Sequence, residues 1–426
     1  MVPLDTVHYL LIVVFVLGYL AIIFEHTIKV NKAATALLMA TISWLILLWY
    51  SGSTIEEKLG DFAKHVADVS QIVFFLLGAM TLVELIDIHK GFKIITDKIN
   101  TRSKKKMLFL ISIFTFFLSS ILDNLTTTIV LISLIRKLIP EAKDRMLLGS
   151  LVVIAANAGG VWTPIGDVTT TMLWLKDKIT TLPTITYLFL PSAISLLVCV
   201  FIFSFFLKGH YPDLLESKKE RNEPGAKLIF YLGIASLISV PIFKAWVDLP
   251  GFMGVFLGVG LLWLLTDFMH YKYEERKHLR LSYVLSKLDI SAVLFFLGIL
   301  LTINSLETMG VLQNLAQFLG RHIGNMAIIA TLIGLISAIV DNVPLVAGAM
   351  GMYPIAIHPT DSLFWQMIAY CAGTGGSILI IGSAAGVAFM GMEKIDFLWY
   401  LKRISLIALI GYFAGILTYI LMKAVF

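Results

Sequence analysis

Two aspartates lie in the middle of long apolar stretches of this 426-residue sequence. Asp123 lies within residues 107–138 and Asp341 within residues 323–353, and each is followed directly by an asparagine. An ionisable group in the middle of a membrane segment is energetically costly and indicates a functional site by default. Both aspartates could instead cap a following helix, because Asp and Asn are favoured N-caps, and the two roles can coexist. We expect function to be the stronger reason, since an uncharged serine or asparagine would also cap.

A second group of polar and helix-breaking residues interrupts the apolar run 145–175. It contains Asn157, a pair of glycines, Pro164, Asp167 and three consecutive threonines. Glycine and proline in mid-membrane interrupt a helix and free half-helix ends to bind an ion, although glycines also serve close helix packing. The matching segment 373–386 carries paired glycines and serines but no carboxylate. The sequence therefore predicts two similar broken helices, only one of which supplies a charge.

The side chains and backbone of these four segments offer carboxylate, amide, hydroxyl and carbonyl oxygens. Such hard ligands suit Na⁺ or Li⁺, and the sequence has no Cys/His cluster for a softer metal. Burial favours the protonated form of a carboxylate, and a nearby cation favours the charged form. One carboxylate can therefore hold either a proton or Na⁺, which gives obligate exchange. No lysine or arginine lies in the polar centres of these segments to neutralise an anionic substrate.

Other ionisable groups in or near the apolar runs are weaker candidates. Glu84 lies deep enough to be a secondary proton site, whereas interfacial solvation is the expected reason for Asp87 and Glu307. Four histidines near predicted helix ends or loops are expected to be solvated: His8, His26, His89 and His210.

The composition indicates that lipid surrounds most of the chain. Hydrophobic residues make up 58% of the sequence and charged residues 14%, whereas a soluble chain is nearer half apolar and a quarter charged. The two cysteines, Cys199 and Cys371, are expected to be small buried residues without a disulfide or a metal. A helix of about 20 apolar residues crosses the hydrocarbon core. About ten runs qualify, near residues 7–24, 33–50, 70–87, 145–175, 184–207, 228–247, 251–269, 289–306, 363–392 and 404–424.

The two aspartate-bearing runs differ from these spans. Each is too long for one span and too short for two, which is typical of a helical hairpin that enters the membrane halfway and returns. With both hairpins re-entrant and both termini outside, most of the 33 lysines and arginines fall on the inside, as the positive-inside rule requires. The inside segments are then 25–32, 88–106, 136–145, 208–227, 270–288 and 393–403.

Three sequence blocks occur twice, in the same order and at a nearly constant separation. FFLLG at 74–78 matches LFFLG at 294–298, SSILDN at 119–124 matches SAIVDN at 337–342, and NAGGVWTPIG at 157–166 matches GTGGSILIIG at 373–382. Each half then holds five spans and one hairpin and begins on the opposite side of the membrane, as in many alternating-access transporters. The expected organisation is a first inverted repeat at 1–207 with its hairpin at 107–138, a cytoplasmic linker at 208–227, and a second repeat at 228–426 with its hairpin at 323–353.

At these motifs the chain resembles the NhaD-type sodium/proton antiporters of the ion transporter superfamily. The resemblance rests on DNLTTT at 123–128, NAGGVWTPIGDVTT at 157–170, SAIVDNVPLV at 337–346 and GTGGSILIIGSAAG at 373–386. It implies a homodimer in which a transport unit moves against a scaffold. It also implies functional residues at Asp123, Asn157, Asp167, Thr169, Thr170, Ser337, Asp341, Asn342, Ser377 and Ser383, to which the first motif adds Asn124 and Thr126.

The sequence therefore predicts an all-α inverted-repeat transporter that exchanges Na⁺ or Li⁺ for H⁺, with Na⁺ at Asp123, Asp341 and Asp167. It is expected to be a multi-pass protein of the cell inner (plasma) membrane, without a cofactor and without nucleic-acid partners. Dicarboxylate transporters of the superfamily typically carry Ser-Asn-Thr at the hairpin tips, so a sodium-coupled dicarboxylate or other anion symporter is the first alternative. An oxyanion (arsenite-type) efflux carrier is the second. A membrane-embedded hydrolase ranks lowest, because no His-Glu zinc motif or Gly-x-Ser-x-Gly elbow is present.

Overall fold

The protein is built from helices. A computed structural model describes residues 5–50, 55–96, 99, 101–139, 141–211, 223–247 and 249–425. Within these ranges there is no strand, and a single isolated bridge pairs Ser103 with His210. The predicted class, an all-α polytopic membrane protein, is confirmed. Most of the predicted linker, residues 212–222, lies outside the described residues.

Eight helices in the described part of the chain are long and apolar enough to span a membrane by length and composition. All eight correspond to predicted spans, and α4 begins much earlier than its predicted apolar run, with polar turns around Glu57 and Lys64. They are α1 (Thr6–Ile23), α3 (Lys32–Tyr50), α4 (Ile55–Ile88), α10 (Thr181–Phe203), α11 (Ala226–Val247), α12 (Gly251–His270), α14 (Ile290–Thr308) and α21 (Ser405–Val425).

The two predicted hairpins are pairs of shorter helices. Helices α6 (Lys104–Ser119) and α7 (Asn124–Leu138) form the first pair. Helices α16 (Met326–Ile336) and α17 (Asn342–Met352) form the second, with 11 residues in each arm. A helix rises 1.5 Å per residue, so none of these four arms reaches across a 30 Å hydrocarbon core.

Two more predicted spans are helices with a break, as the glycine and proline content suggested. Helix α8 (Ala142–Gly160) ends at a glycine pair, and α9 (Val168–Leu175) resumes after Asp167. Helix α18 (Leu363–Gly375) and α19 (Ala384–Glu393) are separated in the same way before Ser383. These two broken helices occupy the remaining two predicted runs, while eight helices of the described part of the chain qualify as spans on their own.

The remaining elements are short and lie between the spans. One of them, α15 (Val311–His322), was not predicted; it alternates apolar residues with Gln313, Asn314, Gln317 and Arg321 and meets α16 at an angle of 119°. The others are α2 (Glu25–Ile28), α5 (Lys93–Thr96), α13 (Leu281–Val284), α20 (Phe397–Arg403) and the 3₁₀ helices η1 (Glu274–Leu279) and η2 (Leu285–Lys287).

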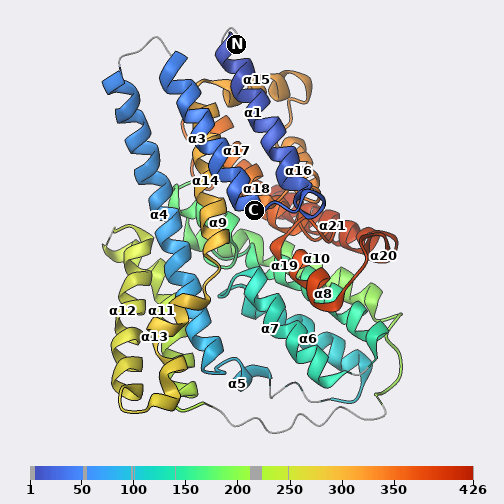
Figure 1. The fold of residues 1–426 in the computed structure, drawn as a ribbon. Coiled ribbons are helices and arrows are strands. Elements are labelled where there is room, and N and C mark those ends of the chain that lie inside the picture. The colour runs from blue at the N-terminus through green and yellow to red at the C-terminus, as the bar shows by residue number, and fades with distance from the viewer. Residues whose placement is uncertain are drawn as a thin grey trace.

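The helices pack in an interleaved manner. Helix α3 packs along α14, and α11 and α12 pack beside α4, which runs down the left of Figure 1. The second arm of each hairpin contacts the second half of the broken helix from the other end of the chain: α7 packs on α19, and α17 packs on α9. Residues at the two hairpin tips are therefore placed beside both helix breaks.

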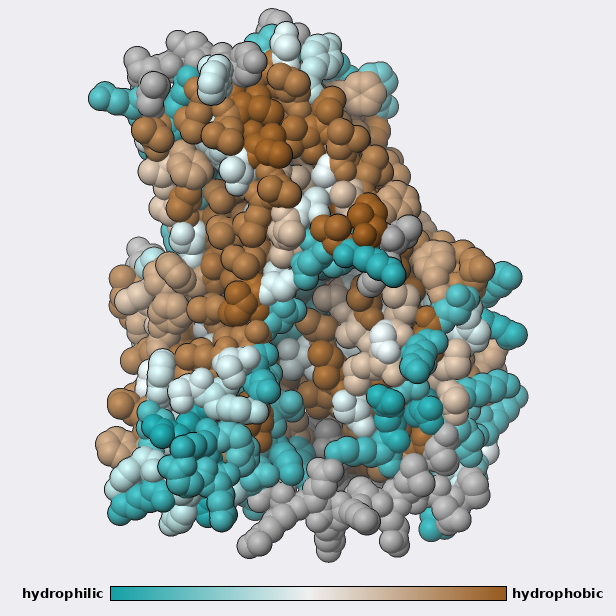
Figure 2. Space-filling view, viewed as in Figure 1, coloured by the Kyte–Doolittle hydropathy of each residue, from teal (hydrophilic) through white to brown (hydrophobic). Residues whose placement is uncertain are grey.

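The surface matches a membrane protein. Figure 2 shows apolar side chains over a broad area around α1 and α3, and polar side chains gathered at the lower left, where α11 to α13 end. Large apolar residues such as Leu38, Leu45 and Phe268 are more than half exposed along the spans. Contiguous exposed apolar surface of this extent is expected where lipid replaces water.

Two of the four histidine predictions are wrong. His89 is fully buried, with its Nδ1 2.8 Å from the Leu85 carbonyl and its Nε2 3.3 Å from Nε2 of His270. His8 is also buried, between Asp5 and the backbone of Met309. A position near a helix end does not expose a side chain when another helix end packs over it. His210 is exposed, as predicted. The side chain of His26 lies outside the described residues.

Candidate functional site

The first hairpin tip holds its carboxylate as a helix cap. Asp123 is the N-cap of α7, and its Oδ1 accepts a hydrogen bond from the Thr126 backbone N–H at 2.7 Å. Its Oδ2 accepts a second bond from the Thr126 hydroxyl at 2.8 Å. The negative charge therefore lies at the positive end of the α7 dipole. Among the described residues, no lysine or arginine forms an ion pair with Asp123.

The second tip has the same cap and an added cation. Asp341 caps α17 by accepting a hydrogen bond from the Val343 N–H at 3.2 Å. The ammonium of Lys32, the first residue of α3, lies 3.4 Å from the other carboxylate oxygen. This ammonium also lies 4.5 Å from the centroid of the Phe295 ring of α14. The two tips are thus similar in backbone geometry and different in charge.

Both tip aspartates are less buried than the sequence suggested. Asp123 is partly exposed, and the Asp341 side chain is 22% exposed. The carboxylates at the hairpin tips are therefore only partly shielded by the protein. Asp167 is the deeply buried acid, with 2% of its surface exposed.

Asp167 belongs to a carboxylate cluster, made of Asp167, Thr169, Asn342 and Gly373. The Thr169 hydroxyl donates to Asp167 Oδ2 at 2.9 Å, and the Asn342 amide donates to the same oxygen at 3.2 Å. A methyl group added to Gly373 would lie 3.2 Å from this oxygen. Although Asp167 stands at the N-cap position of α9, its side chain makes no capping hydrogen bond. Its carboxylate instead accepts its two hydrogen bonds from the side chains of Thr169 and Asn342.

A second cluster, the amide cluster, consists of Asn124, Asn157 and Ser383. The Asn124 amide donates to Asn157 Oδ1 at 3.0 Å. The Asn157 amide in turn donates to the Ser383 hydroxyl at 3.0 Å and to the Val153 carbonyl at 3.0 Å. Ser383 also accepts a bond from the Gly386 N–H at 3.2 Å, so it caps α19. All three members of the cluster are buried.

The two clusters correspond position by position through the repeated motifs. Each cluster has three corresponding members. One is the first residue of a hairpin's second helix, one lies in the helix before a break, and one is the N-cap of the helix after the other break. In that order the members are Asn124, Asn157 and Ser383 in the amide cluster, and Asn342, Gly373 and Asp167 in the carboxylate cluster. One arrangement therefore has no ionisable group, and the other contains a carboxyl group.

The remaining predicted site residues make supporting bonds near the clusters. The Thr170 hydroxyl donates to the Asp167 carbonyl at 2.9 Å. The Ser337 hydroxyl donates to the Ala372 carbonyl at 2.8 Å, which attaches the second hairpin, α16 and α17, to α18. Ser377 bonds to the Thr374 carbonyl within its own helix end and joins neither cluster. Within the described part of the chain, Glu84 of α4 forms no hydrogen bond or ion pair with a member of either cluster.

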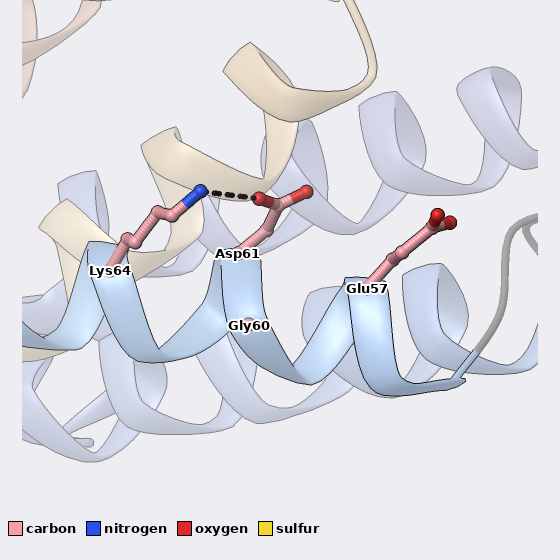
Figure 3. Close-up of a pocket in the computed structure, with 4 residues that line it drawn as sticks. All are labelled: Glu57, Gly60, Asp61 and Lys64. Carbon is pink, nitrogen blue, oxygen red and sulfur yellow. Dashed lines mark ion pairs between the residues drawn. The ribbon is translucent and has the colours of Figure 1, made fainter.

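A surface hollow of about 380 Å³ lies on the first turns of α4. Figure 3 shows its lining residues, Glu57, Gly60, Asp61 and Lys64, with an ion pair of 3.6 Å between the last two. None of them is a predicted site residue, and the hollow is open and polar. None of its lining residues belongs to the carboxylate cluster or the amide cluster.

Lys32 is the residue near the site that sequence reasoning missed. Its position at the inside end of a span predicted only an orientation charge. Lys32 and Asp341 are 309 positions apart in the chain, so no local sequence pattern could predict their contact. Lys32 lies in α3, outside the hairpins and the broken helices themselves.

Comparison with known proteins gives consistent matches along most of the chain. A family model described as "Citrate transporter" (CitMHS) matches residues 19–373. The chain is 54% identical to sodium/proton antiporter 1 of Arabidopsis thaliana, over 95% of this chain and 71% of that protein. It is 51% identical to sodium/proton antiporter 2 of the same plant, over 95% and 97% of the two chains. It is 28% identical to the Na⁺/H⁺ antiporter NhaD of Alkalimonas amylolytica, over 99% and 93%.

Proposed function

This chain belongs to the citrate transporter family and, within it, to the NhaD-type sodium/proton antiporters, and from that premise we propose that it exchanges Na⁺ for H⁺ across a membrane. The relatives named sodium/proton antiporters cover nearly the whole chain. The protein is a multi-pass membrane transporter. Symport of an anion and efflux of an oxyanion are not favoured, because the relatives reported above are named for cation exchange.

The carboxylate cluster is the observation that carries the proposed chemistry. Asp167 is buried at a helix break, and its carboxylate is held by one hydroxyl and one amide. A carboxylate in such surroundings can be neutralised by a proton or by Na⁺, but the two cations repel each other when they share it. Binding of one therefore releases the other. The oxygens of Thr169 and Asn342 are hard donors of the type that Na⁺ prefers.

The hairpin aspartates are proposed as further cation positions. Asp123 and Asp341 each lie at the start of a helix that contacts the other broken helix. Asp341 also directly precedes Asn342, whose amide donates a hydrogen bond to Asp167 Oδ2 at 3.2 Å. Neutralising one of these carboxylates therefore affects the cation affinity of the other. The proposed ligands are Asp123, Asn124, Thr126, Asn157, Asp167, Thr169, Thr170, Ser337, Asp341, Asn342, Ser377 and Ser383, with Glu84 as a secondary proton site.

Alternating access through two inverted repeats, 1–207 and 228–426, is part of the proposal. Its support is the recurrence of equivalent contacts in the two halves. The Ser119 hydroxyl donates to the Ala156 carbonyl at 2.6 Å, as Ser337 does to Ala372. Each hairpin is thereby attached to the first half-helix of its own repeat, so that hairpin and broken helix move together when access changes.

We further propose a homodimer in the cell inner (plasma) membrane, with the basic loops on the cytoplasmic side. The clustering of Lys and Arg in the segments predicted to be inside supports this orientation. Light scattering coupled to size-exclusion chromatography in detergent tests the dimer, because a mass of one chain of 47.3 kDa would contradict it. Membrane fractionation of the native host tests the location.

Proton flux in everted vesicles or proteoliposomes tests the proposed exchange. A pH gradient is imposed, and Na⁺, Li⁺, K⁺ or Ca²⁺ is added separately. Na⁺ should collapse the gradient through the protein, while vesicles that lack the protein should hold it. Citrate added together with Na⁺ tests the symport alternative directly. Sodium-dependent citrate uptake without cation-triggered proton movement would replace the proposed function by symport.

A further inference from the structure

The contact between Lys32 and Asp341 joins different parts of the fold. Lys32 begins α3, which packs along α14, whereas Asp341 begins α17 in the second hairpin. The ammonium lies 3.4 Å from Asp341 Oδ2 and 4.5 Å from the Phe295 ring centroid of α14. It is thus held between a carboxylate and an aromatic face, two groups that both attract a cation.

Among the described residues, no lysine or arginine forms an ion pair with Asp123 at the first hairpin, and the helix that corresponds to α3 begins without a charge. Gly298 of α14 packs against Ala36 of α3, and its motif partner, Gly78 of α4, packs against Val255 of α12. Helix α12 therefore takes the place beside α4 that α3 takes beside α14. The first four residues of α12 are Gly-Phe-Met-Gly and carry no charge. Lys32 makes Asp341 chemically different from Asp123, although the two motifs match.

Charge balance gives this difference a consequence for ion binding. Asp341 directly precedes Asn342, whose amide donates a hydrogen bond to Asp167 Oδ2 at 3.2 Å, so the two carboxylates belong to one region of the site. With the ammonium in place, the Asp341 carboxylate already has a positive partner. Na⁺ that binds at Asp341 must take the position of the ammonium, because two cations cannot share one carboxylate without mutual repulsion.

We propose that Lys32 is a tethered cation that competes with Na⁺ for Asp341, so that Na⁺ is bound there only when the ammonium withdraws. This inference rests on the proposed exchange function and adds a residue that sets the Na⁺ affinity of the site. Lys32 is a positioning and specificity residue in this scheme, since it acts on Na⁺ through Asp341.

Two substitutions at Lys32 should shift the Na⁺ affinity in opposite directions. Lys32→Gln removes the competing charge, and the apparent KM for Na⁺ should fall by roughly threefold to tenfold. Lys32→Arg provides a stronger, bidentate partner for the carboxylate, so the apparent KM should rise. A merely structural role of Lys32 would instead impair both variants in the same direction, mainly through lower yield and lower maximal rate.

Lys176→Gln is the matched control. Lys176 also forms an ion pair with an aspartate of another helix, at 2.6 Å from Asp68, and its side chain is 32% exposed against 34% for Lys32. It contacts neither cluster, so its removal should leave the KM for Na⁺ unchanged. A fall in KM in this control equal to that of Lys32→Gln would assign the effect to general surface charge and overturn the proposal.

The measurement is Na⁺-dependent proton flux in proteoliposomes, with the amount of folded protein quantified for each variant. Because Asp341→Asn should lose exchange, Na⁺ binding to the purified protein is measured in that background. There, Lys32→Gln should no longer change the affinity for Na⁺. An unchanged or raised KM in folded Lys32→Gln would overturn the inference. If Lys32→Gln does not fold, an unchanged or lowered KM for Na⁺ in Lys32→Arg would overturn the inference. Wild-type protein without Na⁺-dependent proton flux would instead refute the proposed function itself.

Discussion

At the scale of single residues, the carboxylates have separated into three environments. Asp123 caps a helix and pairs with no described cation, Asp341 caps a helix and pairs with Lys32, and Asp167 is buried without making a capping bond. The sequence motifs indicated all three acids as candidates. Their ranking by burial could not be predicted, because it depends on how helices from distant parts of the chain pack around each carboxylate.

The Asp167→Asn variant tests whether the buried carboxylate is a cation ligand. Asparagine preserves the shape and the bond to Thr169 but removes the charge, so the apparent KM for Na⁺ should rise by roughly ten- to hundredfold, or about 1–3 kcal/mol of binding free energy. Na⁺ dependence should be recorded at several pH values, with Asp167→Glu in parallel and Asp61→Asn as an exposed control. Superimposable curves for the wild type and Asp167→Asn would remove Asp167 from the site.

The hairpin aspartates should be required for exchange and not for folding. Asp123→Asn retains an N-cap of nearly equal strength, so its melting temperature should stay near that of the wild type while Na⁺/H⁺ exchange is lost or severely reduced. Asp341→Asn should likewise lose exchange, although Lys32 is then left without its partner. Thermal unfolding in detergent and proton flux, measured on the same preparations, check both expectations. Full exchange in both variants would exclude the tips as cation positions.

At the scale of elements, glycines set how closely the hairpins approach the broken helices. A side chain at Gly159 would collide with the Phe116 carbonyl of the first hairpin, and one at Gly375 with the Gly334 carbonyl of the second. These contacts are to backbone, which cannot turn aside as a flexible side chain does. The packing reading of these glycines, which the sequence left open, is therefore part of how both breaks are positioned.

Alanine substitutions at these glycines should destabilise the protein. Gly159→Ala and Gly375→Ala should each lower the free energy of unfolding by about 1–3 kcal/mol, the usual range for overpacking, with a lower melting temperature. Gly348→Ala in α17 is the control, because no atom lies within 4 Å of its added methyl group. Alanine is the better helix former, so this variant should be neutral or slightly more stable. Equal melting temperatures for all three variants would contradict the close-packing argument.

Helices that a long apolar run defines were predicted well. Helices of mixed composition that form because one side packs on neighbours were predicted poorly. The eight continuous spans and both interrupted hairpins follow from long apolar runs with polar centres. Helix α15 was missed because its mixed composition resembles a loop, and the first turns of α4 were missed because Glu56, Glu57 and Lys64 lower the local hydropathy. Such helices form because one side packs on neighbours, which a hydropathy average does not report.

At the scale of the whole molecule, the inverted topology remains a prediction that labelling can test. Ser103→Cys should react with an impermeant thiol reagent from the cytoplasmic side and Thr360→Cys from the outside. Both side chains are partly exposed, and the two native cysteines, Cys199 and Cys371, are free and buried, so they should give little background. Intact cells and everted vesicles supply the two sides. Reaction of both positions from one side would rule out the inverted arrangement.

The interleaved packing also determines when the carboxylate cluster can form during biosynthesis. Asn342, which donates a hydrogen bond to Asp167, follows it by 175 residues and is therefore translated long after α9 has left the ribosome. Throughout that interval only Thr169, two residues away, accompanies the carboxylate into the bilayer. An early insertion intermediate thus carries an acid that the membrane tolerates poorly, and its protonated form is the one compatible with lipid. The acid acquires its second partner only when the late segments arrive and close around it.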